Sequence, residues 1–262
     1  MKKLKSSQNN IAVDYLIIGT GNIAIRHLEN ITNLSNKKII AVCKRFKSKL
    51  NKKFEKKEIR IVSNLDKIVP KNNKAIAIIC SAASMHVNDA EEVAKKGFNI
   101  LLEKPLTTAK AKTDRLIKIC KDNNLKTLVG YNMRFTNRIK SIANILKNKK
   151  HGSIKDIEIS VETDFRKWRK DVDYKKTVSF DKSLGGGVIN ELSHEIDYLN
   201  LLFGKPEKVS VKNIAATNKK NNIETHITAI FEYVQKHPVV KMKLDMLSKK
   251  TERYCKINFK NS

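Results

Sequence analysis

Long hydrophobic runs and paired cysteines are absent from this 262-residue chain. No apolar run reaches the roughly 18 residues that a membrane-spanning helix needs, so the sequence predicts no span. The opening segment MKKLKSSQNN is not followed by an apolar stretch of signal-peptide length, which predicts that the chain is not secreted. The four cysteines lie far apart, with no CxxC. This spacing argues against a metal site and a disulfide framework, and it favours a cytoplasmic location.

Acidic residues are scarce, because 26 Asp and Glu face 54 Lys and Arg, which gives a net charge of +28. Such an excess is typical of proteins that bind nucleic acid or acidic membranes. Arginine, however, accounts for only 9 of the cations, and the lysines are spread along the whole chain. Arginine is the residue that clamps phosphates and reads bases. We therefore expect a compositional excess of lysine, with neither nucleic acid nor membrane as a partner.

The first half of the chain alternates short apolar segments with amphipathic ones. Strands are expected at 13–19, 37–43, 58–62, 74–80, 99–103 and 126–130, and helices at 21–33, around 48–57, at 84–96 and at 107–123. Repeated β-α units of this length predict an α/β domain over residues 11–131, with a doubly wound parallel sheet and helices on both faces.

After residue 131 the pattern changes to few helices and long alternating strands. Helices are expected at 136–149 and 185–202, and strands at 154–163, 208–217, 224–234, 239–247 and 253–259. Alternation of apolar and polar residues is typical of an antiparallel sheet with one exposed face. Residues 132–262 are therefore expected to form an α+β domain with a largely antiparallel open sheet.

The segment GTGNIA (19–24) lies between the first expected strand and helix. In a dinucleotide-binding turn, a first glycine makes the tight bend and a second lets the backbone approach a pyrophosphate. Gly19 and Gly21 occupy those places, and Ala24 takes the third, where close packing is needed. The amides at the helix start would then hold the anion. An ordinary glycine turn is the alternative.

The second expected strand ends at Cys43, followed by Lys44 and Arg45. An NAD site places a carboxylate here for the ribose hydroxyls, whereas cations suit the 2′-phosphate of NADP. No acid occupies these positions, so NADP is favoured over NAD. The alternative is that both cations are simply solvated.

Two further segments carry groups suited to proton transfer. Lys104, in Glu103-Lys104-Pro105, follows an expected strand, where it could donate to a substrate oxygen. The glycine run 185–187 precedes Glu191 and His194, which are three residues apart and would share a helix face. A carboxylate and an imidazole can bind a polyol and move its proton. The alternatives are a surface lysine and a structural histidine.

In order and spacing, five motifs resemble the Gfo/Idh/MocA oxidoreductases over about residues 13–260. They are IGTGNIA…RH (18–27), CSAASMH (80–86), EKPL (103–106), GYNMRF (130–135) and GGGVINELSHEIDYL (185–199). The resemblance implies a Rossmann domain followed by an α/β domain whose open sheet supports a homodimer or homotetramer. It also implies hydride transfer between NAD(P) and a hydroxyl-bearing carbon of a sugar, cyclitol or nucleotide sugar.

Site residues follow from the residue patterns and this resemblance together. The expected catalytic residues are Lys104, His194 and Glu191. Cofactor contacts are expected from Gly19, Thr20, Gly21, Asn22, Ile23, Lys44, Arg45, Cys80, Ser81, His86, Glu103 and Lys104. Substrate contacts are expected from Asn132, Arg134, Trp168, Arg169, Tyr174, Asn190 and His194. The loop that contains Trp168 resembles a subgroup involved in bacterial surface-sugar biosynthesis.

The chain departs from the family pattern in two places. The usual Asp four residues before the histidine is Asn190 here, and Glu191 is the preferred equivalent because it lies three residues before His194. Family members also run some 50 or more residues further, so the second domain is expected to be shortened. These departures keep open a second hypothesis, a catalytically weak dinucleotide-binding regulatory or scaffold protein.

Overall fold

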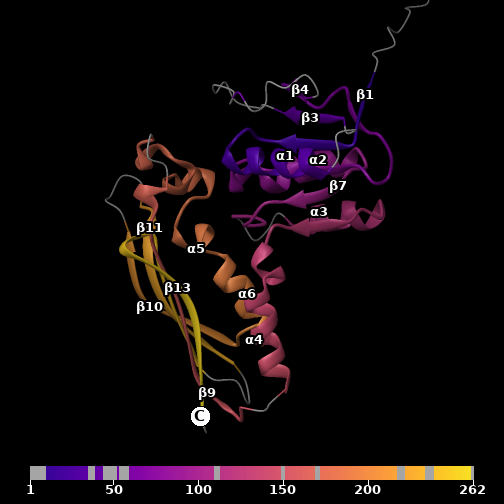
Figure 1. Ribbon diagram of the computed structural model, residues 1–262. Coiled ribbons are helices and arrows are strands. Elements are labelled where there is room, and N and C mark those ends of the chain that lie inside the picture. Colours follow the sequence, from indigo (N-terminus) through magenta and orange to yellow (C-terminus); the bar gives the residue numbers. More distant parts are fainter. Residues whose placement is uncertain are drawn as a thin grey trace, which may run out of the picture. The chain divides into compact units, whose positions relative to one another are not determined.

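The computed structural model divides into two compact units, Met1–Gly130 and Tyr131–Ser262 (Figure 1). The structure describes residues 10–34, 39–43, 52, 59–108, 113–148, 151–168, 172–216, 222–233 and 239–260. Within these ranges, no helix is long and apolar enough to cross a membrane.

The first unit is built on a six-stranded parallel sheet in the order β4-β3-β2-β6-β7-β8. Its strands are β2 (Tyr15–Ile18), β3 (Ile40–Cys43), β4 (Ile59–Val62), β6 (Ile76–Ile79), β7 (Asn99–Leu102) and β8 (Thr127–Val129). The order steps outward from β2 in both directions, which is the doubly wound arrangement of a Rossmann domain. The predicted fold class of this half is confirmed.

Helices cover both faces of this sheet because its central strands are apolar on both sides. Helix α1 (Asn22–Leu34) packs on one face against a core that includes Ile17 and Val42. On the other face, Leu16 and Ile18 belong to the core formed with α2 (His86–Lys95) and α3 (Thr113–Asp122). The helix expected around 48–57 lies outside the described residues, apart from Lys52.

A small parallel pair of strands was not expected from the sequence. Strand β1 (Ile11–Val13) pairs with β5 (Ile68–Pro70), and Asp14 separates β1 from β2. The segment expected as one strand over 13–19 therefore bends at Asp14, whose carboxylate accepts a hydrogen bond from the Ile39 amide at 3.0 Å. The pair is only three residues long, which is too short to produce a clear periodicity.

The second unit contains a five-stranded sheet in the order β10-β11-β12-β9-β13. Its strands are β9 (Ile154–Asp164), β10 (Lys208–Ala216), β11 (Glu224–Glu232), β12 (Val240–Asp245) and β13 (Leu247–Phe259). Only the β12–β9 pair is parallel. The sheet is therefore largely antiparallel, as predicted.

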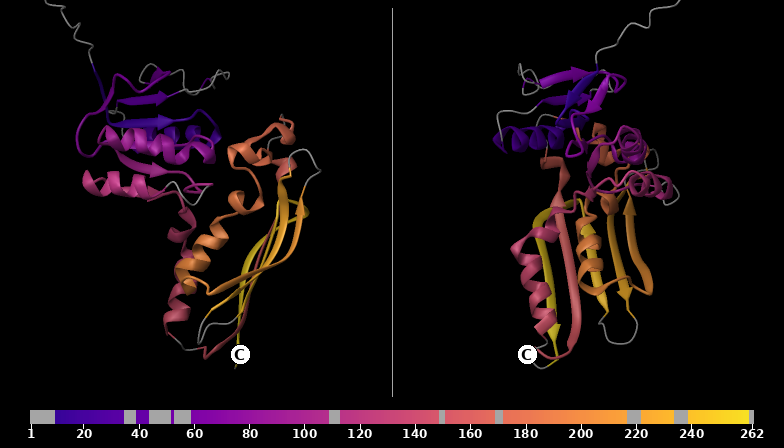
Figure 2. Two further views of the ribbon diagram at one scale, coloured as in Figure 1. Left: turned by 180° about the vertical axis from the view of Figure 1, so that it is seen from behind. Right: turned by 90° about the vertical axis from the view of Figure 1, so that its right-hand side faces the viewer.

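One face of this sheet packs against helices. Figures 1 and 2 show α4 (Asn137–Asn148) and α6 (His194–Phe203) along the same face. The apolar residues of β9, β11 and β12 that point to this side alternate with residues that point away, and they join the helices in one core. In the views of Figure 2, no described helix lies over the opposite face. The sheet is thus open on one side within the described chain.

The helix predicted over 185–202 is two helices in the structure. Helix α5 (Val188–Glu191) is followed by Leu192, whose φ of −103° and ψ of 29° lie outside the helical region, and α6 begins at His194. The prediction that Glu191 and His194 lie one turn apart on a single helix was therefore wrong. Single-turn 3₁₀ helices occupy Ala83–Met85, Asn132–Phe135, Phe165–Lys167, Tyr174–Lys176, Val178–Phe180 and Lys182–Leu184.

Candidate active site

The two glycines of the turn after β2, Gly19 and Gly21, differ in the space around them. Gly19 has φ +107°, and a Cβ placed on it would lie 2.6 Å from the Cys80 carbonyl oxygen, so a side chain is excluded by the protein itself. A Cβ on Gly21 would meet nothing within 4 Å. The fold therefore requires glycine at position 19, whereas the space beside Gly21 is open.

That open space lies at the start of α1. The helical hydrogen bonds begin with the Ile25 amide, which donates to the Gly21 carbonyl at 3.1 Å. The amides of the first turn have no carbonyl ahead of them in the helix, and no acidic residue lies in this turn. Amides at a helix N-terminus, beside an open glycine, form a cradle for a phosphate anion. This segment therefore fits the pyrophosphate of a dinucleotide, and it comprises Gly19, Thr20, Gly21, Asn22 and Ile23.

Cys80, Ser81 and His86 follow β6, next to this turn. Cys80 is buried, and burial, followed by the charge of Glu103, raises the pKa of its thiol well above the usual range. His86 is 2% exposed, and its Nδ1 lies 2.7 Å from the Pro105 carbonyl while its Nε2 lies 3.1 Å from the Ser81 carbonyl. Burial is the main cause that lowers the pKa of His86. His86 thus links the end of β6 to the segment after β7.

Glu103 and Lys104 follow β7, and the Lys104–Pro105 peptide bond is cis. The Glu103 carboxylate lies 2.7 Å from His27 Nε2 on α1 and accepts a hydrogen bond from the Lys104 amide at 3.3 Å. Burial by itself raises the pKa of Glu103, but His27 and Lys104 outweigh it, and the net pKa lies below its ordinary value. A Cβ on Gly130 would lie 3.2 Å from the same carboxylate. Glu103 therefore connects α1, the Lys104 backbone and the end of β8.

In the second unit, His194 lies at the first position of α6, where it packs edge-on against Tyr131. Their ring centroids are 5.7 Å apart at 83°. Burial raises the pKa of Tyr131, and the charge of Asp197 acts in the same direction. The phenol stays neutral at physiological pH and remains a hydrogen-bond donor. Tyr131 therefore gives the His194 imidazole an uncharged aromatic neighbour.

An ion pair between Arg134 and Asp197 joins the one-turn helix Asn132–Phe135, at the start of this unit, to α6. Arg134 Nε donates to Asp197 Oδ2 at 2.7 Å, and a second nitrogen of the guanidinium donates to the other carboxylate oxygen. The pair raises the pKa of Arg134. Asn132 is exposed in the same one-turn helix. The guanidinium predicted to contact substrate is thus engaged by Asp197.

Asn190 and Glu191 lie on the short helix α5 after the glycine run. The Asn190 amide donates to the Gly185 carbonyl at 3.1 Å, which closes the glycine turn. Gly187 has φ +114°, and a Cβ on it would meet the Glu224 side chain. The positive φ therefore favours glycine at 187, because other residues would be strained there.

Trp168 and Tyr174 lie in the loop after β9. Trp168 stacks on Phe165, and Tyr174 packs edge-on against Phe180. Arg169, like Lys44 and Arg45, lies outside the described residues.

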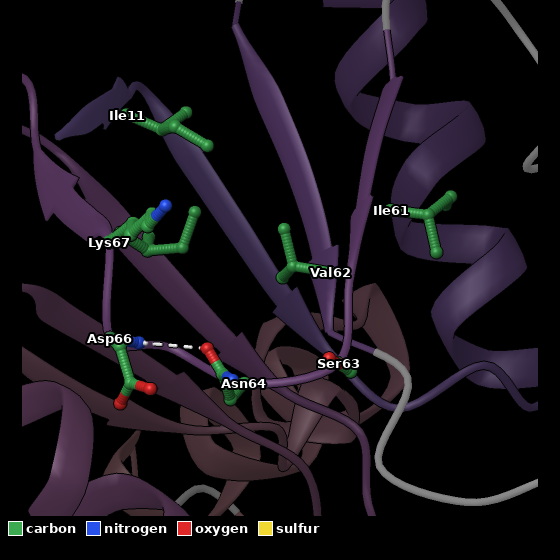
Figure 3. Close-up of a pocket in the computed structure, with 8 residues that line it drawn as sticks. Ile11, Ile61, Val62, Ser63, Asn64, Asp66 and Lys67 are labelled. Atoms are coloured by element: carbon green, nitrogen blue, oxygen red, sulfur yellow. Dashed lines mark hydrogen bonds between the residues drawn. The ribbon is translucent and has the colours of Figure 1, made fainter. Parts of the chain in front are cut away.

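A cavity of about 380 Å³ lies elsewhere in the first unit (Figure 3). It is lined by Ile11, Ile61, Val62, Ser63, Asn64, Asp66, Lys67 and Ile68. None of these was predicted as a site residue. Three further residues support the predicted ones without having been predicted as site residues: His27, Tyr131 and Asp197. All three belong to the motifs of the sequence, and Asp197 also lies three residues after His194.

Comparison with known proteins places both units in one family. The family model described as "Oxidoreductase family, NAD-binding Rossmann fold" matches residues 13–131, and the "GFO/IDH/MocA C-terminal domain" matches residues 139–255. An uncharacterized oxidoreductase of Escherichia coli, YhhX, is 26% identical over 174 residues, which are 66% of this chain and 48% of that protein. Inositol 2-dehydrogenase of Rhizobium meliloti is 24% identical over 207 residues, or 79% of this chain and 59% of that protein.

Among solved structures, the WlbA dehydrogenase of Bordetella pertussis in complex with NADH and UDP-GlcNAcA is similar, with a TM-score of 0.77 at 19% identity. The alignment covers 96% of this chain and 75% of that one, and at this identity it shows the shared fold. The chain spans about half the length of the curated relatives that it matches. With both domain models matched in order on the two units, the chain belongs to the Gfo/Idh/MocA family of oxidoreductases, and its first unit is their NAD(P)-binding Rossmann domain.

Proposed function

We propose that the chain is an NAD(P)-dependent oxidoreductase that transfers a hydride between the nicotinamide and a hydroxyl-bearing carbon of a sugar, cyclitol or nucleotide sugar. The observation that carries the proposal is the open Gly21 at the start of α1, because the protein's own packing leaves that space unfilled. A dinucleotide pyrophosphate has the charge and size for it. Inositol and nucleotide-sugar dehydrogenases among the similar proteins support the substrate class.

In this proposal, Lys104 and His194 act on the substrate hydroxyl. A bound nicotinamide would supply or accept the hydride. The Lys104 ammonium donates a hydrogen bond to the reacting oxygen, and His194 takes or returns the hydroxyl proton. Glu191, which lies at the end of α5, assists His194 in this proton transfer. Tyr131, packed edge-on at 5.7 Å, limits the orientations of the imidazole.

NADP is the favoured coenzyme, with NAD as the alternative. Cys43 ends β3, and the two residues that follow it in the sequence are Lys44 and Arg45. Two cations and no carboxylate at this point support a 2′-phosphate. Replacing both residues by Asp and Ala should shift the ratio of dissociation constants toward NAD, as measured by calorimetry with each coenzyme.

A homodimer or homotetramer formed through the second sheet is proposed as the assembly, in a cytoplasmic setting. The open face carries ordered polar pairs: Lys243 donates to Glu162 at 2.6 Å, and Tyr254 donates to Glu158 at 2.7 Å. Fixed polar pairs on an open sheet face support a specific contact between copies. Light scattering on eluted protein would measure the mass, and a monomer at all concentrations would contradict the assembly.

The experiment that tests the function measures coenzyme binding and hydride transfer separately. Calorimetry with NADP and NAD reports binding, and absorbance at the reduced-nicotinamide wavelength reports turnover with UDP-sugars, free sugars and inositols. Saturable binding with turnover of at least one substrate is expected. Binding without turnover on any of them would favour the regulatory or scaffold hypothesis instead.

A further inference from the structure

We propose that Trp168 is a stacking surface for the base of a nucleotide, so that the substrate is a nucleotide-linked sugar rather than a free polyol. This inference rests on the proposed function and narrows its substrate class. It starts from the chain's single tryptophan, which is 58% exposed.

The Trp168 ring is exposed but held in place. One face stacks on the buried Phe165, with ring centroids 3.8 Å apart and planes 27° apart. Its indole Nε1 donates to Thr163 Oγ1 at 3.1 Å. With one face and the N–H engaged, the exposed area belongs to the other face and the remaining edge. An aromatic ring fixed before binding loses little entropy when a planar ligand stacks on it.

The charges beside the ring favour an anionic ligand. Arg166 Nε donates to Asp164 Oδ1 at 2.7 Å, and Lys167 Nζ lies 3.8 Å from Asp164 Oδ2. Asp164 thus pairs with both cations, and Asp245 also raises the pKa of Arg166, so the exposed Lys167 is the cation best placed to meet an anionic ligand. A nucleotide diphosphate offers both an aromatic base and negative charge, whereas a free polyol offers neither. Flat base and cation contacts occur together where proteins bind nucleotides.

The strand topology places Trp168 near the glycine turn of the same unit. Strand β9 ends at Asp164, β12 runs parallel to it and ends at Asp245, and β11 begins at Glu224. These three ends lie at one end of the sheet. The Glu224 side chain is against Gly187, just before α5. The stacking surface and the helix that leads to His194 therefore lie at the same end of the second unit.

A titration that uses the single tryptophan tests the inference directly. UDP, inorganic pyrophosphate and myo-inositol would be added separately while the indole fluorescence is recorded. UDP should change the fluorescence saturably because its base contacts the ring. Pyrophosphate has the charge without the base and should change it much less, and myo-inositol should leave it unchanged. An equal response to UDP and pyrophosphate, or a response to myo-inositol alone, would overturn the proposal.

Variants then separate stacking from folding. Trp168→Leu should weaken UDP binding about five- to 150-fold by calorimetry, the range typical of a lost base–aromatic stack. Trp168→Phe keeps a flat ring and should recover most of the affinity. Val172→Ala, an exposed apolar change in the same loop, is the matched control and should bind as wild type does. Wild-type UDP affinity in Trp168→Leu would contradict the stacking role.

Failure of this inference can be told from failure of the proposed function. Coenzyme binding is measured on the same preparations, and hydride transfer is measured with free polyols and with UDP-sugars. Turnover of free polyols without UDP binding would remove the nucleotide specificity and keep the oxidoreductase. UDP binding that depends on Trp168, together with no coenzyme binding, would keep the stacking surface and remove the oxidoreductase.

Discussion

His27 and Glu103, 76 residues apart in the chain, are joined by a 2.7 Å hydrogen bond between helix α1 and the segment that carries Lys104. The contact connects the helix whose start is the proposed phosphate cradle to the backbone of the proposed catalytic lysine. Both side chains are mostly buried, with 18% and 16% of their surfaces exposed. A shift of either partner would therefore move Lys104 relative to the glycine turn.

Glu103→Gln tests the charge of this pair, because glutamine keeps an acceptor for His27 and loses the negative charge. The pKa of Glu103 is lowered in the folded protein, so its ionised form contributes stability above the unfolded-state pKa of about 4.3. That contribution disappears as the pH falls from there through the folded pKa. The variant should melt below wild type at pH 7, and the difference should shrink below about pH 4.3. Thermal melts across this range measure it, and a pH-independent difference would contradict the assignment.

Gly21→Asp tests the phosphate cradle without disturbing the fold. A side chain at this position meets no protein atom within 4 Å, and Asp is a favourable residue before a helix start. The melting temperature should therefore stay the same or rise. The added carboxylate repels a pyrophosphate, so coenzyme affinity should fall at least tenfold, since about 1.4 kcal/mol suffices.

Gly21→Asn is the matched control for this variant, because it has the same size and helix-capping ability without the charge. It should bind coenzyme more tightly than Gly21→Asp in calorimetry. Equal affinity in wild type and Gly21→Asp would place the pyrophosphate elsewhere.

Lys104→Met and His194→Ala test the proposed proton chemistry. Each should lower kcat at least tenfold, because positioned acid–base groups contribute about 10²–10⁴-fold. The coenzyme dissociation constant of His194→Ala should stay near that of wild type. Steady-state kinetics with the most active substrate of the panel gives kcat, and calorimetry gives the coenzyme dissociation constant. Wild-type turnover in both variants would remove the assigned roles.

Arg253→Met tests an ion pair that ties β13 to helix α6. Arg253 Nε lies 3.0 Å from Glu195 Oε1, and Glu195 is 0% exposed. The substitution weakens the compensation of a buried carboxylate, which should lower the free energy of unfolding by about 3–5 kcal/mol.

The double variant Arg253→Met with Glu195→Met separates charge from packing in the same pair. It should recover part of the loss, because it removes the buried charge as well. Denaturant unfolding measures both variants. A double variant as unstable as the sum of the two single ones would mean that the residues act independently.

Local patterns were sufficient to predict the six-stranded sheet of the first unit, but not its short β1–β5 pair. Strands such as 15–18 and 76–79 are short apolar runs, the first of them bounded by Asp14 and Gly19, and this short-range pattern alone distinguishes them from the helices between. The glycine spacing at 19 and 21 carried the dinucleotide prediction for the same reason. Alternation along 224–232 likewise predicted a sheet with one covered face.

Contacts between distant segments required the tertiary structure. The break at Leu192, which divides Glu191 from His194, follows from backbone angles that the residue spacing does not reveal. The pairs His27–Glu103 and Glu195–Arg253 depend on which elements the fold packs together. Sequence by itself therefore determined most of the helices and strands, the domain family and the candidate chemistry, since each is read from patterns and motifs of residues close in the chain. Only the folded chain decided which side chains hold those groups in place, because a hydrogen bond depends on distance and direction in space.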